Sequence, residues 1–171
     1  MKLDLGSGHV RIKGWERVDL DPEADADYKI AIQDVENHFK RNTVDKIRAY
    51  HVLEHISPKE VFPTLRGWWK VLKPEGTVTI EVPNCEYAIH AYADEDISWS
   101  EVERIILGAD QDATEWMVHR CLFTPKKLQR FFMITGFVDI VLNDSKEEVV
   151  NMTAKKPFEL PIKKAKTDNK I

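Results

Sequence analysis

The stretch Lys2-Leu3-Asp4-Leu5-Gly6-Ser7-Gly8 decides the fold. Its apolar residues predict a short strand that runs directly into a Gly-x-Gly turn. Because glycine has no Cβ, the backbone of such a turn can approach a bound ligand closely. The dinucleotide-binding fingerprint requires another glycine three residues after Gly8, and that position is Arg11. The turn therefore predicts a ligand site at a strand end and disfavours a dehydrogenase.

Strands and helices alternate after this turn. Helices are expected from Ser57, where Pro58 and Glu60 complete a capping box, from Ser100 with Glu103, and from Thr124-Pro125 to Gly136. This alternation predicts an α/β fold with a mainly parallel sheet, helices on both faces and a C-terminal antiparallel hairpin. The expected strands are Trp15 to Asp19, Tyr28–Ile32, Val44–Tyr50, Thr77–Val82, and the hairpin pair Phe137–Leu142 and Val149–Thr153.

The connection from Gly8 to Trp15 is unusually short. A crossover between parallel strands normally needs about a dozen residues or more, because it contains a helix. We therefore expect the first helix to be lost or reduced to a turn. Its loss would leave the ligand pocket more open, or residues 85–120 would fill the space.

Acidic residues follow the second and third predicted strands. Asp19 can accept hydrogen bonds from both hydroxyls of a ribose, as the acidic residue at this point of Rossmann folds does. It can equally be a turn aspartate before Pro22. Asp34 can meet an adenine amino group, or it can cap a helix.

Taken in order, these segments resemble the methyltransferase type 11 group of the class I S-adenosylmethionine-dependent methyltransferases. The resemblance covers most of residues 1–155 and implies a Rossmann-like sheet of seven mostly parallel strands. It also implies S-adenosylmethionine as the cofactor and S-adenosylhomocysteine as its product. The segments that carry it are 3–8 (LDLGSG), 18–22 (VDLDP), 51–56 (HVLEHI), 71–76 (VLKPEG) and 119–125 (HRCLFTP) leading to Gly136-Phe137.

The resemblance also implies roles for matching residues. The methionine end of the cofactor would lie among Asp4, Gly6, Ser7 and Gly8. Asp19 would hold the ribose, and Leu20 would pack on the adenine. Asp34 would take the adenine amino group beside the Val35 backbone, and His51 would lie near the sulfonium and the substrate entrance. The family often has a further glycine where this chain has Val10.

Methyl transfer is a direct displacement at an activated carbon, so alignment is the main task of the protein. A hydroxyl acceptor also benefits from a general base. The candidates are His119, His51 and His55, and His119 comes first because it follows the variable segment 85–120. Alternatively, His119 is bonded to backbone, and Glu54 and His55 only hold loops together.

Two other functions fit parts of the sequence. Residues 51–55 match H-x-x-E-H, the inverted zinc-protease motif, which requires all five residues inside one helix. His51 instead ends a predicted strand, so we expect no metal site and place the zinc hydrolase last. The other alternative is a non-catalytic partner subunit that binds S-adenosylmethionine without turnover.

Composition limits the partners. The net charge of -4 argues against nucleic acid, since phosphate binding needs clustered Lys and Arg. No apolar run approaches the ~18 residues of a membrane span. The two cysteines form no CxxC pair and suit a reducing compartment, so we expect a cytoplasmic protein.

We expect one domain over residues 1–156 and a flexible, Lys-rich tail over 157–171. Residues 85–120 form a long connection after the Thr77–Val82 strand, and such segments are often functional. The acidic side chains of this segment suit a neutral or cationic small molecule, or a basic peptide, better than nucleic acid, and we expect a small-molecule acceptor. These acidic side chains are Glu86, Asp94, Glu95, Asp96, Asp110 and Asp112.

Overall fold

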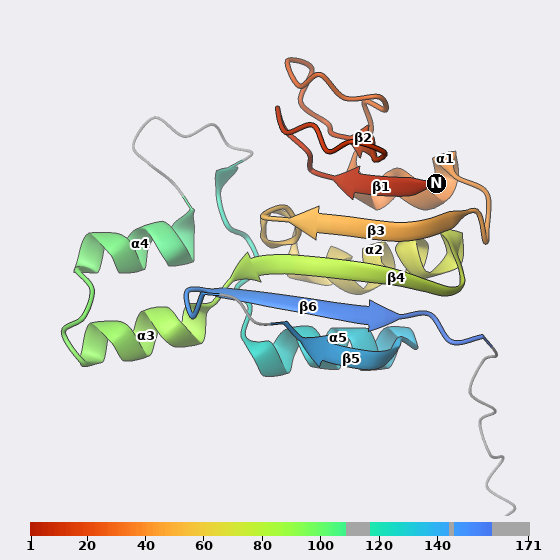
Figure 1. Cartoon of the computed structure of the whole chain (residues 1–171). Helices are drawn as coiled ribbons and strands as arrows, with labels where there is room; N and C mark the ends of the chain where they lie inside the picture. Colours follow the sequence, from red (N-terminus) through yellow and green to blue (C-terminus); the bar gives the residue numbers. More distant parts are fainter. Residues whose placement is uncertain (109–116, 144–145, 159–171) are drawn as a thin grey trace, which may run out of the picture.

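The strands form a single mixed sheet in the order β2-β1-β3-β4-β6-β5 (Figure 1). The computed structural model describes residues 1–108, 117–143 and 146–158. β1, β2, β3 and β4 are mutually parallel, and β6 runs antiparallel to β4 and β5. This is a Rossmann-like α/β arrangement. The bounds are β1 Lys2–Leu5, β2 Glu16–Val18, β3 Val44–Tyr50, β4 Leu72–Pro83, β5 Val138–Leu142 and β6 Val149–Lys155.

The helices that pack on the sheet lie on one face. Figure 1 shows α1, α2 and α5 behind the sheet, and α3 with α4 beyond the carboxyl ends of β3 and β4. The expectation of helices on both faces is therefore wrong for the described residues. The bounds are α1 Val35–His38, α2 Pro58–Val71, α3 Cys85–Ala93, α4 Trp99–Leu107 and α5 Pro125–Thr135, with short 3-10 turns η1 at Ile32–Asp34 and η2 at Leu53–His55.

Side-chain alternation along the central strands explains this one-sided packing. In β4, Val78, Ile80 and Val82 are fully buried under the helices, whereas Thr77, Thr79 and Glu81 on the other face are partly exposed. Successive side chains of a strand point to opposite faces, so an apolar row alternates with a polar row. The polar face needs no helix to cover it.

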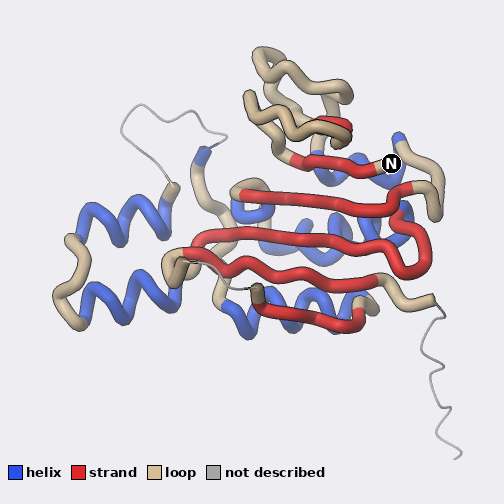
Figure 2. The backbone as a smooth tube through the Cα atoms, viewed as in Figure 1, coloured by secondary structure: helices blue, strands red, loops and turns tan. Residues whose placement is uncertain are grey.

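The absent first helix accounts for the uncovered face. The described residues between β1 and β2 contain no helix, as the short connection predicted. Figure 2 shows this connection, and the one after β2, as loops at the edge of the sheet. The loop after β1 therefore stands directly over the carboxyl ends of the strands, where ligands bind in such sheets.

Tyr28–Ile32 is not the predicted strand. Tyr28 forms only an isolated parallel bridge with Val18, and the chain then enters η1. The sheet consequently has six described strands where seven were expected. The reason is tertiary, because the fully buried Trp68 of α2 donates its indole N–H to the Ile32 carbonyl at 2.8 Å. That bond and the burial of Ile32 draw the chain away from the sheet.

The capping box of α4 lies two residues before its predicted position. Ser98 and Glu101 form the box, and the Ser98 N–H donates to the Glu101 carboxylate at 2.8 Å. Both S-x-x-E pairs are present in the sequence, so local chemistry allows either start. The earlier start includes Trp99, whose ring packs edge-on against Tyr92 of α3 at 5.4 Å between centroids.

The C-terminal strands pair in antiparallel register, with Val138 opposite Lys155 and Leu142 opposite Met152. Residues 144–145 of their connection, Asp110 and Asp112 of the predicted acidic segment, and residues 159–171 of the predicted tail lie outside the described residues. Among the helices that the structure describes, none has the length and apolar character needed to cross a membrane.

Candidate active site

A cavity of about 210 Å³ opens beside the Gly-x-Gly turn at the carboxyl end of β1. Of the predicted cofactor residues, Gly6, Asp19 and Leu20 line it. The remaining walls come from η1 with the residue before it, from residues around η2, from the start of α2, and from Arg120 in the segment that precedes α5. These further lining residues are Ala31, Ile32, Gln33, Val52, His55, Ile56, Glu60 and Arg120.

Gly6 occupies a position that only glycine fits. Its φ is +67°, in the left-handed region, and an added Cβ would lie 2.4 Å from Val52 Cγ2. The Gly6 N–H donates to the Val18 carbonyl at 2.8 Å, which ties the turn to the end of β2. The turn is therefore packed against the residue that follows the end of β3, and this contact sets the floor of the cavity.

Asp19 braces the turn through backbone amides. Its carboxylate accepts from the Gly8 N–H at 2.7 Å and from the Asp21 N–H at 2.9 Å. Each carboxylate oxygen keeps a second lone pair, and the side chain borders the cavity. The two interpretations of Asp19 are thus compatible, because a turn aspartate can also accept a hydrogen bond from a ligand hydroxyl. Leu20 is 50% exposed beside it, free to pack on a flat ring.

Other predicted cofactor residues lie behind or beside the cavity. Asp4 is fully buried and accepts from Arg48 Nη1 at 2.7 Å, and Ser7 is buried within the turn. Asp34 is exposed and accepts from Asn37 Nδ2 at 3.3 Å, whereas Val35 is in the core. Gln33, the neighbour of Asp34, lines the cavity instead. No local pattern predicted that Gln33 would take this place, because η1 replaces the expected strand end.

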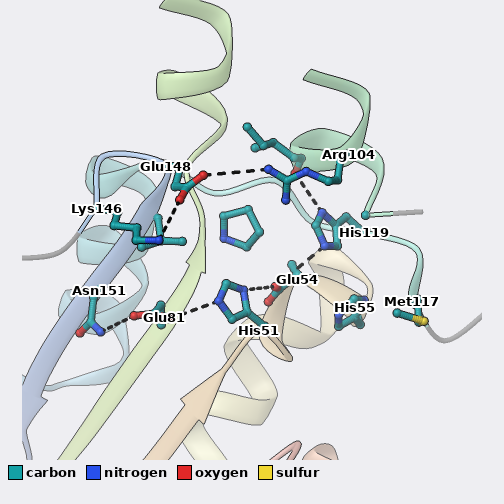
Figure 3. A pocket seen from close by; sticks show the side chains of 14 residues that line it. His51, Glu54, His55, Glu81, Arg104, Met117, His119, Lys146, Glu148 and Asn151 are labelled. Carbon is teal, nitrogen blue, oxygen red and sulfur yellow. Dashed lines mark hydrogen bonds and ion pairs between the residues drawn. The ribbon is translucent and has the colours of Figure 1, made fainter. Parts of the chain in front are cut away.

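A larger cavity of about 810 Å³ adjoins the first, and His55 lines both. Figure 3 shows His51, His119 and Glu54 pointing toward one another within it, with Glu81 beside His51 and Glu148 facing Arg104. The end of α4 and residues 117–119 form one side. All three predicted catalytic histidines line this cavity. Sequence order alone could not show that His51 and His119 converge.

His51 directly follows β3 and has a left-handed conformation with φ of 51°. Its Nε2 lies 3.2 Å from Glu81 Oε1, and its Nδ1 lies 3.6 Å from Glu54 Oε1. The hydrogen-bonding interaction with the Glu54 carboxylate raises the pKa of His51 above its ordinary value, and burial opposes this only in part. His51 therefore carries positive charge more readily than a free histidine does.

His119 is held by backbone and is largely buried. Its Nδ1 lies 3.0 Å from the Ile105 carbonyl, and its Nε2 lies 4.0 Å from Glu54 Oε1. Burial lowers the pKa of His119, so the neutral imidazole is favoured. His119 is thus bonded to a backbone carbonyl, as one of its two interpretations from the sequence predicted. Its second ring nitrogen still faces the cavity.

His55 lies beside His119, with 5.1 Å between the ring centroids. Its Nδ1 is 3.3 Å from the Val118 carbonyl. His55 belongs to η2, and His51 lies at the end of β3, so the H-x-x-E-H residues do not share an α-helix. The geometry that the zinc-protease motif requires is therefore not formed.

Glu54 is the functional candidate that sequence reasoning underrated. Its carboxylate is almost fully buried, and within the described part of the chain neither oxygen has a hydrogen-bond partner. The Glu54 backbone carbonyl accepts from the N–H groups of Arg120 and Cys121, at 2.8 and 2.9 Å, which anchors the 117–121 segment to η2. Because a buried carboxylate is costly unless it is paired, this one is a strong candidate for a ligand contact.

The other two carboxylates that line this cavity, Glu81 and Glu148, have polar or charged partners. Glu81 accepts from Asn151 Nδ2 at 2.7 Å. Glu148 lies 4.0 Å from Arg104 and 3.7 Å from Lys146. The Glu54 carboxylate instead has histidines near it, with His51 Nδ1 at 3.6 Å and His119 Nε2 at 4.0 Å from Oε1.

Comparison with known proteins finds a family match over the amino-terminal part of the chain. Residues 3–80 match the family described as methyltransferase domain, within the type 11 group. Curated proteins yield no significant sequence match. The family match ends with β4, so it includes both cofactor-side loops and η2 but not residues 117–121.

Solved structures share the fold at low sequence identity. An S-adenosylmethionine-dependent methyltransferase from Methanosarcina mazei has 18% identity and a TM-score of 0.65, over 92% of this chain and 92% of its own. The 1,6-didemethyltoxoflavin-N1-methyltransferase of Burkholderia thailandensis, solved with its substrate and S-adenosylhomocysteine, has 17% identity and a TM-score of 0.60, over 91% and 70%.

A possible exported protein from Bordetella parapertussis has 16% identity and a TM-score of 0.62, over 91% of this chain, which spans 61% of that protein. The fold, the glycine turn and the family match agree. The likeness is to class I S-adenosylmethionine-dependent methyltransferases, whose methyltransferase-domain model matches residues 3–80 of this chain, and S-adenosylmethionine is the cofactor of that family.

Proposed function

We propose that the protein transfers a methyl group from S-adenosylmethionine to a small-molecule acceptor. The observation that carries this proposal is the pair of adjoining cavities that share His55. One cavity has the glycine turn and Asp19, and the other has a cluster of histidines. A displacement reaction needs two ligands that meet end to end, and the arrangement supplies a compartment for each.

The smaller cavity suits the cofactor. The methionine end would lie at the Gly6–Gly8 turn, with Asp4 and Ser7 behind it, and Asp19 would accept from the ribose. Leu20 would cover the adenine, whose amino group would meet Gln33 or Asp34 beside the Val35 backbone. At about 210 Å³ the cavity is below the ~300–1,000 Å³ typical of ligand sites, so the bound cofactor would remain partly exposed. That openness agrees with the missing first helix.

The larger cavity suits the acceptor. Its volume of about 810 Å³ is within the range for small ligands, and its walls supply donors, acceptors and charges of both signs. Orientation of two bound reactants supplies roughly 7–11 kcal/mol toward such a reaction. His119, His51 and His55 are the proposed groups that orient the acceptor or take its proton.

Residues 85–120 would serve as the acceptor-binding insert of a single domain over residues 1–156. Arg104, Ile105 and Gly108 of this segment line the larger cavity. The net charge of -4 supports a small molecule over a nucleic acid as acceptor. Cys85 and Cys121 are both free thiols, which suits the reducing cytoplasm that we propose as its location.

Calorimetric titration with S-adenosylmethionine and S-adenosylhomocysteine tests the cofactor site. We expect micromolar binding to the wild type and affinity at least tenfold weaker for Asp19→Ala, because that variant loses both the ribose acceptor and the brace of the turn. Asp94→Ala, an exposed aspartate at the end of α3, is the matched control and should bind as the wild type does. Failure of folded wild-type protein to bind either ligand would refute the proposal.

Transfer of a labelled methyl group tests the acceptor class. Cell extract is separated into low-mass and macromolecular fractions, and each is incubated with the protein and methyl-labelled S-adenosylmethionine. We expect label in the low-mass fraction with the wild type and none with Asp19→Ala. Label in protein or nucleic acid would contradict a small acceptor. Cofactor binding without any transfer would favour the non-catalytic partner subunit.

A further inference from the structure

Three groups converge at the floor of the larger cavity without a hydrogen-bond donor between them. Glu54, His55 and His119 each place one potential ligand atom within 4.8 Å of the others. Glu54 is buried, and neither carboxylate oxygen has a hydrogen-bond partner in the described part of the chain, since the nearest histidine nitrogens, His51 Nδ1 and His119 Nε2, lie 3.6 and 4.0 Å from Oε1. A buried carboxylate in this state costs free energy unless a cation or a donor occupies the space in front of it.

The two histidines cannot readily supply that donor. A backbone carbonyl only accepts hydrogen bonds, so the Nδ1 atoms of His119 and His55 carry the hydrogens donated to Ile105 and Val118, at 3.0 and 3.3 Å. Their Nε2 atoms are then left with lone pairs. His119 Nε2 faces Glu54 Oε1 at 4.0 Å, so two electron-pair acceptors point at each other.

This arrangement matches the surroundings of metal-binding histidines. Such histidines donate the other ring N–H to a backbone carbonyl or carboxylate, which sets the tautomer and aims the lone pair at the metal. Two imidazoles with one carboxylate suit divalent ions such as Zn²⁺ and Fe²⁺, and leave positions open for other ligands. We propose that Glu54, His55 and His119 bind one divalent transition-metal ion at the floor of this cavity.

The geometry requires a modest closure. Zinc bonds of ~2.0–2.1 Å in a tetrahedral site place the ligand atoms about 3.4 Å apart. The Glu54–His119 separation of 4.0 Å is already close to this value. The three ligand atoms lie within 4.8 Å of one another, so the His55 ring has to move inward, and its partly exposed position on η2 permits such a movement. The proposed metal site differs from the sequence-based expectation of no metal, and it needs no H-x-x-E-H helix.

The open positions would face the acceptor cavity. If the proposed methyl transfer is correct, an acceptor hydroxyl bound to the metal would lose its proton more readily, because a bound cation stabilises the oxyanion. This role rests on the proposed function, whereas metal binding by the three residues does not. The acceptors favoured by this arrangement are therefore small molecules with a hydroxyl that can coordinate the ion.

Calorimetric titration of untagged, chelator-treated protein with ZnCl2 tests the site. We expect saturable binding of one Zn²⁺ per chain, weakened at least tenfold in Glu54→Gln and in His119→Ala. His38→Ala removes an exposed histidine on α1 and is the matched control that should bind normally. Absorption of the Co²⁺ complex provides an independent readout, because tetrahedral coordination to histidine gives an intense visible spectrum.

Two results would overturn the metal site: no saturable Zn²⁺ binding by folded wild type, or binding that Glu54→Gln and His119→Ala leave unchanged. If either variant fails to fold, His55→Ala replaces it, since His55 is partly exposed. Titration with S-adenosylmethionine in metal-free buffer separates the two proposals. Cofactor binding without zinc binding removes only the metal site, and zinc binding without cofactor binding removes only the methyltransferase.

Discussion

At the scale of single residues, the glycine turn shows how the absence of a Cβ atom permits a tight, closely packed turn beside a cavity. Gly6 and Gly8 both have positive φ, at 67° and 51°, so any other residue is strained at either position. They differ in their surroundings. A Cβ on Gly6 would collide with Val52, whereas nothing lies within 4 Å of a Cβ on Gly8. Alanine substitutions at the two positions therefore separate the energetic cost of backbone strain from the cost of a steric clash.

We expect Gly8→Ala to lower the free energy of unfolding by about 1–2 kcal/mol, from the left-handed conformation alone. Gly6→Ala should lower it by about 2–5 kcal/mol, because overpacking adds ~1–3 kcal/mol to the same strain. Urea denaturation of both variants measures the difference. Equal losses would mean that Val52 moves aside at no cost and that the turn is not held by packing.

At the scale of elements, α5 places the 117–124 segment relative to the sheet. Thr124 begins the helix, and its hydroxyl accepts from the Lys127 N–H at 3.2 Å, while Leu128 and Phe132 are fully buried. The same segment carries His119 to Glu54. The start of α5 therefore couples the stability of the core to the position of a proposed functional histidine.

Thr124→Ala should reduce the free energy of unfolding by about 1 kcal/mol, the usual cost of removing an N-cap hydroxyl. Thr124→Ser keeps the hydroxyl and should stay close to the wild type. Chemical denaturation followed by tryptophan fluorescence compares the three proteins. A serine variant as unstable as the alanine variant would show that the Thr124 methyl group, and not the cap, stabilises the helix.

At the scale of the whole molecule, Lys156 joins the end of β6 to the amino ends of the central strands. Its ammonium donates to the Leu72 carbonyl at 2.6 Å and to Asn42 Oδ1 at 2.8 Å, and it lies 4.2 Å from the centre of the Trp69 ring. Burial, aided by Arg41 and Arg66, lowers the pKa of Lys156 from 10.5 to about 8. The charge is thus less favourable in the folded protein than in the unfolded chain.

The sign of the pH effect follows from this lowered pKa. Below a pH of about 8, Lys156 is charged in both the folded and the unfolded state, and burial of this charge destabilises the folded protein in full. This destabilisation disappears as the pH rises to about 10.5, because the folded protein loses the proton first. The free energy of unfolding of the wild type should therefore increase relative to Lys156→Met across this window. Denaturant titrations at a series of pH values measure the difference. A decrease would mean that the carbonyl, amide and ring contacts outweigh burial.

Local patterns were sufficient for several elements. Val44–Tyr50 forms β3 as predicted, Pro58 begins α2 behind its capping box, and α5 runs from Pro125 to Thr135. Each has a strong local cause, such as side-chain alternation, a cap or a helix-start proline. Where two local choices were equally good, as at Ser98 and Ser100, packing between Trp99 and Tyr92 selected one.

The sequence by itself determined the glycine turn, the strand Val44–Tyr50 and the loss of the first helix, because each depends on nearby residues or on the length of a connection. Only the tertiary structure decided that η1 replaces a strand, since the bond from Trp68 to Ile32 joins distant residues. It also decided that His119 meets Glu54. Convergence of groups so far apart in the chain depends on the packing of the whole fold, which no local pattern contains.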